Sequence, residues 1–205
     1  MKTITTLTLL ILTTLAFGQK NKDYLVSYTD SGSGQELIGF KSIKGEVIIS
    51  PKYSYTYTDT LYSMAIVHKD GEWLGIDRNE KVLLEPFIYD NGPDYVKEGL
   101  FRFVENRKMG FANMKGEKII PAKFDFVTPF ADGISEYTLG GNIDYKKGGE
   151  YGEWKGAYEN GYLNRFGQKF KKVKELKYDK REAWTNSNKH VLLDKNGKII
   201  KTFKK

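Results

Sequence analysis

The chain of 205 residues contains no cysteine. Disulfide bridges and thiolate metal sites are therefore excluded, and an oxidising compartment is tolerated without adding stability. Histidine is nearly absent too: His68 and His190 form no spaced pair of the kind that binds a metal. We interpret both as packing or surface residues. The composition thus gives no support to a histidine base, a metal site or any other cofactor.

The sequence also lacks the usual catalytic motifs. It has no Gly-x-Ser-x-Gly elbow and no glycine-rich phosphate loop, because Ser31-Gly32-Ser33-Gly34 has the wrong spacing and is typical of a flexible loop. We therefore predict no catalytic residue. Acidic residues are scattered, however, and two carboxylates from distant segments suffice for glycoside hydrolysis. A carboxylate-dependent glycan hydrolase accordingly remains the alternative to a non-enzymatic protein.

Only one long apolar run is present, and it lies at the N-terminus. Lys2 precedes the apolar stretch Leu7 to Leu15, and Ala16-Phe17-Gly18 supplies small residues at the positions that a signal peptidase prefers. This pattern predicts a signal peptide over residues 1–18, cleaved before Gln19. The stretch falls short of the roughly 20 apolar residues that span a bilayer. We expect an exported protein, periplasmic or extracellular, that does not span a membrane after cleavage.

Charge is unevenly distributed along the chain. The net charge is +7, and the segment from Arg165 to Lys205 contains 14 Lys+Arg against 4 acidic residues. Such a basic end attracts anionic partners, and the run Lys171, Lys172 and Lys174 is a candidate anion-binding site. The alternative is a solvated lysine face. Nucleic acid is not the expected partner, because lysine lacks the rigid fork with which arginine binds phosphate.

What the chain does contain is an internal repeat. The clearest copy covers residues 108–125, and shifting it back by 71 positions places Gly110-Phe111 on Gly39-Phe40 and Lys115-Gly116 on Lys44-Gly45. Another copy between these two, and two fainter ones after them, follow the same pattern. The five copies start at residues 38, 73, 109, 160 and 190. Units this short bury no core alone, so neighbouring copies must stack.

Each copy has the pattern of a hairpin. A short strand leads to a polar pair and a glycine, whose tolerance of positive φ suits a tight turn. A second apolar strand follows, and we expect Pro51, Pro86 and Pro121 to end its pairing, because proline donates no hydrogen bond to a sheet. Acidic and amide side chains beside the turns are predicted to accept local backbone hydrogen bonds. They are Asp77, Asn113, Asp125 and Asp194.

The third copy carries a family resemblance. Lys108-Met109-Gly110-Phe111-Ala112-Asn113, followed by Gly116-Glu117-Lys118-Ile119-Ile120-Pro121 and by Phe130-Ala131-Asp132-Gly133, resembles the WG-containing repeat, also called the KWG repeat. No copy keeps the Trp-Gly pair, since Trp73 precedes Leu74 and the other copies replace the tryptophan. The resemblance implies an exported bacterial protein that serves as a binding or scaffold module, and it supplies no catalytic residues.

These observations predict an all-β protein, a tandem-repeat array of antiparallel hairpins in a continuous meander. An open twisted sheet or solenoid and a propeller-like ring both fit the pattern. After the signal peptide at 1–18 we expect an N-terminal strand and Gly/Ser loop at 19–36. The repeat domain then covers 37–205 and carries a glycine-rich aromatic insertion at about 139–159.

The insertion is the most individual part of the chain. Aromatic side chains on a glycine-rich segment outside a rigid array suit carbohydrate or peptide recognition, so we predict Tyr151, Trp154 and Tyr158 as ligand-binding residues. A hairpin that merely extends the sheet is the alternative. The sequence as a whole predicts a non-enzymatic module that binds a protein or an envelope glycan.

Overall fold

A computed structural model describes residues 23–32, 34, 36–145, 152–176 and 179–204, and the expected signal peptide lies outside these residues. Within them the protein is all-β and contains no helix. Accordingly, the described residues include no apolar helix long enough to cross a membrane. The strands are β1 (Leu25–Asp30), β2 (Leu37–Ser42), β3 (Val47–Tyr53), β4 (Tyr55–Thr56), β5 (Thr60–Leu61), β6 (Ala65–Lys69), β7 (Glu72–Ile76), β8 (Val82–Pro86), β9 (Ile88–Tyr89), β10 (Gly92–Pro93), β11 (Phe101–Glu105), β12 (Lys108–Ala112), β13 (Lys118–Phe124), β14 (Phe126–Val127), β15 (Ile134–Tyr145), β16 (Gly152–Asn164), β17 (Lys169–Glu175), β18 (Arg181–Thr185), β19 (His190–Leu193) and β20 (Ile199–Thr202).

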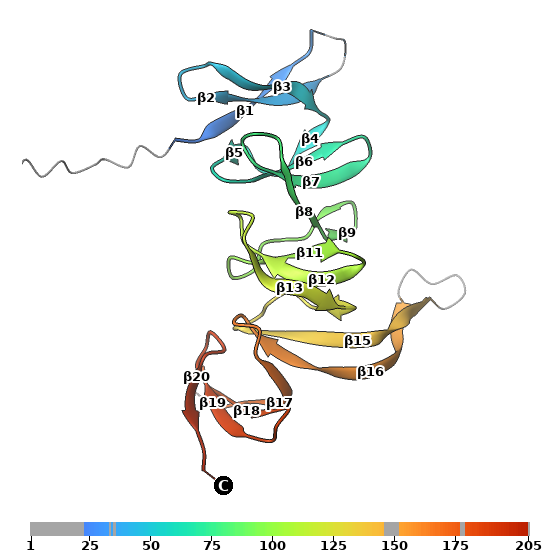
Figure 1. Cartoon of the computed structure of the whole chain (residues 1–205), viewed down its shortest axis with the longest axis vertical. Helices are drawn as coiled ribbons and strands as arrows, with labels where there is room; N and C mark the ends of the chain where they lie inside the picture. Colours follow the sequence, from blue (N-terminus) through green and yellow to red (C-terminus); the bar gives the residue numbers. More distant parts are fainter. Residues whose placement is uncertain (1–22, 33, 35, 146–151, 177–178, 205) are drawn as a thin grey trace, which may run out of the picture.

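The strands form an open array of antiparallel hairpins. A four-stranded sheet has the order β3-β2-β1-β5, a seven-stranded sheet follows with β13-β12-β11-β8-β7-β6-β4, and a second seven-stranded sheet runs from β14 to β20 in chain order. A short β9–β10 hairpin, between β8 and β11 in the chain, forms a separate two-stranded sheet. The units are stacked along the long axis, with β1–β3 at one end and β17–β20 at the other (Figure 1). The array is therefore open, and the ends do not close into a ring.

The hydrophobic core is divided among the junctions between units. One cluster joins Phe40 and Tyr53 of the first copy to Ile76 of the second. Another joins Phe124 of the third copy to Leu163 of the fourth. The remaining two clusters likewise draw on successive copies. The expectation that units are stabilised by stacking is thus confirmed, because the described copies each share their buried side chains with a neighbour.

Six five-residue turns share one hydrogen-bond pattern. The first residue donates its N–H to the carbonyl of the fifth, and its carbonyl accepts the N–H of the fourth. Its side-chain oxygen accepts one or two further N–H groups of the turn. The fourth residue always has positive φ, which explains the preference for glycine there. The turns start at Ser42, Asp77, Asn113, Asn164, Thr185 and Asp194.

This pattern confirms the local role predicted for Asp77, Asn113 and Asp194. The prediction is wrong for Asp125, whose carboxylate accepts the N–H of Gly140, 15 residues away, at 2.8 Å. It also forms a 2.6 Å ion pair with Lys108, and this hydrogen bond to the ammonium lowers the pKa of Asp125. Asp125 therefore ties two strands together.

The expectation that proline ends the strand pairing is also wrong. β3 continues through Pro51 to Tyr53 and β13 continues through Pro121 to Phe124. In both strands the register shifts across the proline, so it lies in a β-bulge where no ladder N–H is needed. Only Pro86 coincides with a strand end.

Candidate functional site

A long groove crosses β14 to β18. Three adjoining hollows of about 450, 480 and 660 Å³ form it. The first two share Thr128, Glu136 and Tyr162 in their walls. The second and third share Asp132, Glu175 and Arg181. Alternate residues of one strand, Ile134, Glu136 and Thr138, line successive parts of the groove, as expected for one face of a β-strand.

One end of the groove is aromatic. Phe126, Trp154 and Tyr162 line it, and the ring centroids of Phe126 and Trp154 lie 5.6 Å apart. The Trp154 indole N–H donates a 2.8 Å hydrogen bond to the carbonyl of Gly140. Two contacts therefore fix the indole, so little side-chain entropy remains to be lost when a ligand stacks on it.

Tyr137, which lines this end, belongs to a small polar network. The hydroxyl of Tyr137 donates to Glu159 at 2.6 Å, and Lys169 forms an ion pair with the same carboxylate at 2.8 Å. Burial, followed by the hydrogen bond to Glu159, raises the pKa of Tyr137. The hydrogen bonds from Lys169 and Tyr137 lower the pKa of Glu159. This network joins β15, β16 and β17.

The opposite end of the groove is charged. Arg181 lies with its side chain 10% exposed, 3.4 Å from the Asp132 carboxylate and 3.8 Å from the Glu175 carboxylate. It also donates to the Asp132 carbonyl at 2.9 Å. Arg165 and Lys180 stand beside it, with further acidic side chains on the rim. The arrangement offers charged donors and acceptors, side by side, to a polar ligand.

The three aromatic residues predicted to bind a ligand differ in their position relative to the groove. Trp154 lies in the groove wall. Tyr158 is 78% exposed and is not among the groove-lining residues; its ring lies close over Gly140. Tyr151 lies outside the described residues. β15 and β16 form the long hairpin of the insertion, which projects sideways from the stack (Figure 1).

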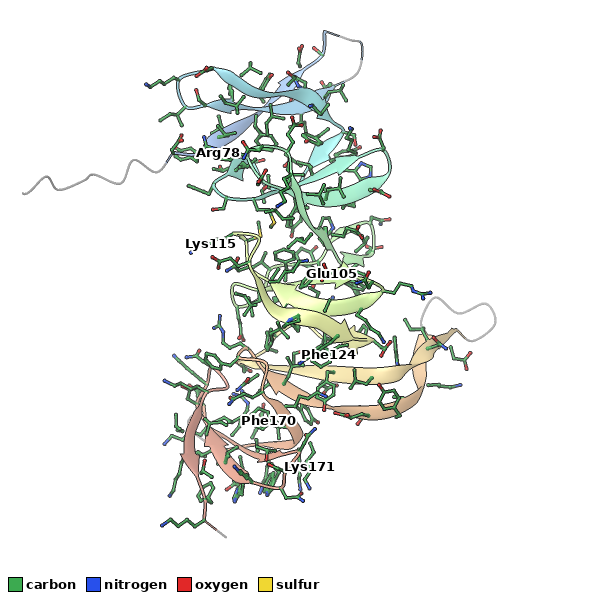
Figure 2. All side chains as sticks on the ribbon, in the orientation of Figure 1. Arg78, Glu105, Lys115, Phe124, Phe170 and Lys171 are labelled. Atoms are coloured by element: carbon green, nitrogen blue, oxygen red, sulfur yellow. The ribbon has the colours of Figure 1, made fainter. Side chains whose placement is uncertain are left out.

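The predicted anion-binding lysines all lie on β17 and each has its own neighbour. Lys171 donates to Asn188, Lys172 lies 5.1 Å from the centroid of the Trp184 ring, and Lys174 is paired in register with Glu182. Lys171 lies at the periphery of the C-terminal unit, whereas the adjacent Phe170 is fully buried (Figure 2). The ammonium groups of Lys171 and Lys172 therefore make different contacts within the sheet.

Both histidines pack against aromatic rings. His68 shares a 2.6 Å hydrogen bond with Ser54 and lies 5.0 Å from the Trp73 ring. His190 is stacked between Trp184 and Phe203. Across the described part of the chain, no three metal-ligating side chains come together.

Sequence reasoning missed Phe126, Tyr162 and Arg181. Each belongs to a different strand, and only the packing of β14, β16 and β18 brings the three to one groove. The alternation of Ile134, Glu136 and Thr138 was the available signal for one exposed strand face. It does not say which other strands border that face.

Comparison with known proteins agrees with the repeat pattern. The family model "WG containing repeat" matches residues 38–73 and 109–142. No curated protein matches the chain. Among solved structures, Hsv2p of Kluyveromyces lactis matches with 14% identity and a TM-score of 0.28, covering 82% of this chain and 57% of that one. Another structure of Kluyveromyces lactis Hsv2 has 12% identity and a TM-score of 0.25, covering 89% and 64%.

The chain spans less than two thirds of the length of these solved structures. The family match is more specific, because it falls on the two copies in which Gly-Phe, the Lys-Gly-Glu turn and the following proline are all present. These two segments of the chain are WG-containing repeats.

Proposed function

We propose that this protein is an exported, non-enzymatic binding module that holds an envelope glycan in the groove across β14 to β18. The observation that carries the proposal is the continuity of that groove from a fixed indole at one end to the Arg181 cluster at the other. Aromatic faces stack on the apolar faces of sugar rings, while charged and polar groups bind hydroxyls. An elongated hollow with few, well-placed polar groups suits such a ligand.

A glycan fits this groove better than a protein partner does. The groove walls alternate apolar side chains such as Ile134 and Val173 with polar ones such as Thr128 and Glu136. A protein interface is expected to contain a dry core of large apolar side chains. The wall here instead mixes apolar and polar side chains along the groove, and this mixed character matches a chain of sugar units.

Binding to immobilised envelope glycans tests the proposal. The mature protein is compared with Trp154→Ala, which removes the stacking face, and with Tyr158→Ala, which changes an exposed ring outside the groove. We expect about a tenfold or greater loss of affinity for Trp154→Ala, as for other central aromatic contacts, and unchanged affinity for Tyr158→Ala. Equal binding by all three proteins, or loss only in Tyr158→Ala, would contradict the groove. A mature N-terminus at Gln19, found by mass spectrometry of the secreted protein, tests export separately.

A carboxylate-dependent glycan hydrolase is the second candidate, because Asp132 and Glu175 flank one guanidinium in the same groove. Hydrolysis requires one carboxyl as acid and the other as base or nucleophile. Release of reducing ends from a bound glycan, abolished in both Asp132→Asn and Glu175→Gln, would favour this candidate. Unaltered glycan after prolonged incubation favours the binding module.

A further inference from the structure

A second hollow lies on the second repeat, far from the groove. Four aromatic side chains line a space of about 330 Å³: Tyr57, Trp73, Tyr89 and Tyr95. We call these four residues the aromatic cage. A neighbouring hollow of about 410 Å³ shares Trp73, Asp90 and Asn91 with it. Of the four cage residues, only Trp73 belongs to the repeat motif, at the position of the family tryptophan.

The rings of the cage surround open space. In the described structure, no ring contact joins two members of the cage. Tyr89 and Tyr95 are 62% and 64% exposed, and Tyr57 is 38% exposed. Side chains of this size usually bury against one another when nothing else covers them. Their faces are therefore available to a ligand.

The backbone under the cage is well anchored. The Tyr57 N–H donates a 2.8 Å hydrogen bond to the Ile66 carbonyl. Trp73 is held against His68, whose ring is fixed by Ser54. Tyr95 follows Asp94, a buried residue whose carboxylate accepts two hydrogen bonds from Arg102 at 2.6 and 2.8 Å. A cage on such supports is formed before any ligand arrives, which lowers the entropy cost of binding.

The charge around the cage has one sign. Asp90 is the charged residue of the cage wall, and Glu72 and Glu85 join it in the neighbouring hollow; the described residues that line the two hollows include no lysine or arginine. This local excess of carboxylates contrasts with the net charge of +7 on the whole chain. Burial, followed by the nearby Tyr95 and Asp94, raises the pKa of the Tyr57 phenol, so this ring stays neutral. Electron-rich ring faces with carboxylates alongside attract a cation.

We propose that the aromatic cage binds an organic cation of the quaternary ammonium class. The trimethylammonium group has no hydrogen-bond donor, and its charge is spread over methyl groups that fill a space between rings. Cation–π attraction to tryptophan and tyrosine faces recognises this chemistry. The carboxylate of Asp90 supplies the long-range attraction. Free choline and the choline headgroup of a lipid carry the same group, so both are candidate sources.

Calorimetric titration of the mature protein with choline chloride tests the cage. The matched control ligand is 3,3-dimethylbutan-1-ol, which has the same shape and no charge. We expect choline to bind at least tenfold more tightly than this neutral isostere. Vesicles of phosphatidylcholine, compared with vesicles of phosphatidylglycerol, then show whether a membrane headgroup or the free cation is preferred. Equal affinity for choline and its isostere, or no binding of choline, would overturn the proposal.

Variants locate the binding site. Tyr95→Ala removes one exposed ring and Asp90→Asn removes the carboxylate charge, and we expect each to weaken choline binding by about fivefold or more. Tyr158→Ala, which changes an exposed tyrosine outside the cage, should bind as the parent protein does. Thermal unfolding by circular dichroism confirms that all variants fold. Unchanged choline affinity in both cage variants refutes the cage, as does Tyr95-dependent binding of a neutral glycan without binding of choline.

Discussion

Two glycines of the Gly-Phe pairs have no room for a side chain. A Cβ atom on Gly39 would lie 2.4 Å from the Ile49 carbonyl oxygen, and one on Gly110 would lie 2.4 Å from the Ile120 oxygen. Both oxygens belong to the strand that bulges at its proline. The proline bulge and the glycine therefore occur together, on facing strands. Both copies have glycine at this position because the backbone of the partner strand comes so close that a Cβ atom has no room.

Substitution of this glycine measures that closeness. We expect Gly110→Ala to lower the free energy of unfolding by about 2 kcal/mol or more, because the clash is with backbone atoms that cannot rotate away. Gly92→Ala is the matched control, since a Cβ at Gly92 meets nothing within 4 Å. Urea unfolding of both variants gives the comparison. Equal stability of the two would show that the bulge yields easily.

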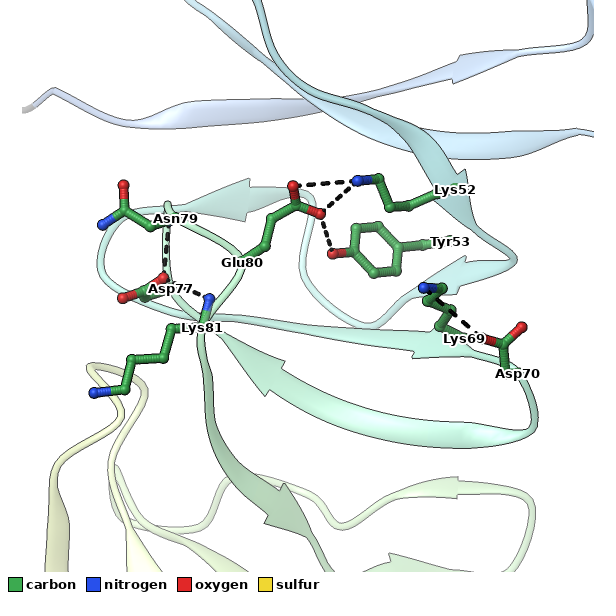
Figure 3. Close-up of polar contacts among 8 residues, drawn as sticks. All are labelled: Lys52, Tyr53, Lys69, Asp70, Asp77, Asn79, Glu80 and Lys81. Atoms are coloured by element: carbon green, nitrogen blue, oxygen red, sulfur yellow. Dashed lines mark hydrogen bonds and ion pairs between the residues drawn. The ribbon is translucent and has the colours of Figure 1, made fainter.

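Glu80 is a second residue with a specific local role. It occupies the turn position that is glycine in four of the six turns, with φ of 62°. Its carboxylate reaches the preceding repeat, where it lies 2.8 Å from the Lys52 ammonium and accepts a 3.0 Å hydrogen bond from the Tyr53 hydroxyl (Figure 3). The hydrogen bond from Lys52 lowers the pKa of Glu80 below its ordinary value. The folded state therefore favours the ionised carboxylate.

This shift predicts a pH-dependent stability. A carboxyl with a lowered pKa in the folded state stabilises the protein above its usual pKa and ceases to do so as the pH falls through the folded value. We expect Glu80→Gln to lower the free energy of unfolding by less than about 1 kcal/mol at pH 7, because the pair is partly solvated. The difference in free energy of unfolding between Glu80→Gln and the parent protein should vanish when the pH falls below the lowered pKa of Glu80. Urea unfolding at a series of pH values checks it, and a difference that persists at low pH would contradict the assignment.

At the scale of the elements, one buried ion pair joins three segments. Arg102 of β11 and Asp94 are each 3% exposed, and Arg102 also donates to the Val127 carbonyl of β14 at 3.0 Å. The guanidinium lies 4.5 Å from the centroid of the Phe87 ring. This pair fixes the segment after β10 against the junction between the third and fourth copies. Removing one partner leaves the other charge buried and uncompensated.

We expect Asp94→Asn to lower the free energy of unfolding by about 3 to 5 kcal/mol. The matched control is Glu105→Gln, which weakens the 2.6 Å pair with Lys118, whose side chains are 49% and 35% exposed. That exposed pair should contribute less than about 1 kcal/mol. Glu105, labelled in Figure 2, is the last residue of β11. Similar losses in the two variants would mean that burial does not decide the strength of these pairs here.

At the scale of the whole molecule, the open array gives the two ends fewer neighbours than the middle. Stability in such an array is a sum over units and their junctions, and terminal units have one junction each. We therefore expect native-state hydrogen exchange to be fastest in β20 and slowest in β11 and β12, around the fully buried Phe103 and Phe111. Exchange at one common rate throughout would contradict this graded stability and indicate a single cooperative unit.

The repeat itself could be predicted from the sequence, because its causes are local. A glycine after a polar pair determines the turn at Lys115-Gly116, and a side-chain oxygen at Asn113 accepts the N–H groups within reach. These interactions span four residues or fewer, so the pattern, the strands and the WG-containing repeat follow from neighbouring residues. The prediction that Pro51 and Pro121 end the strand pairing was wrong, because a bulge depends on the partner strand and not on neighbouring residues alone.

The groove and the aromatic cage depend on the tertiary structure. Arg181 meets Asp132 across 49 positions of sequence, and the rings of the cage come from three separate segments. Their meeting depends on the rotation from each unit to the next, which sums small differences in packing over the whole stack. The same rotation decides between an open array and a ring. The sequence by itself therefore determined the unit and the need for units to stack, whereas the curvature of the stack decided its shape and its binding surfaces.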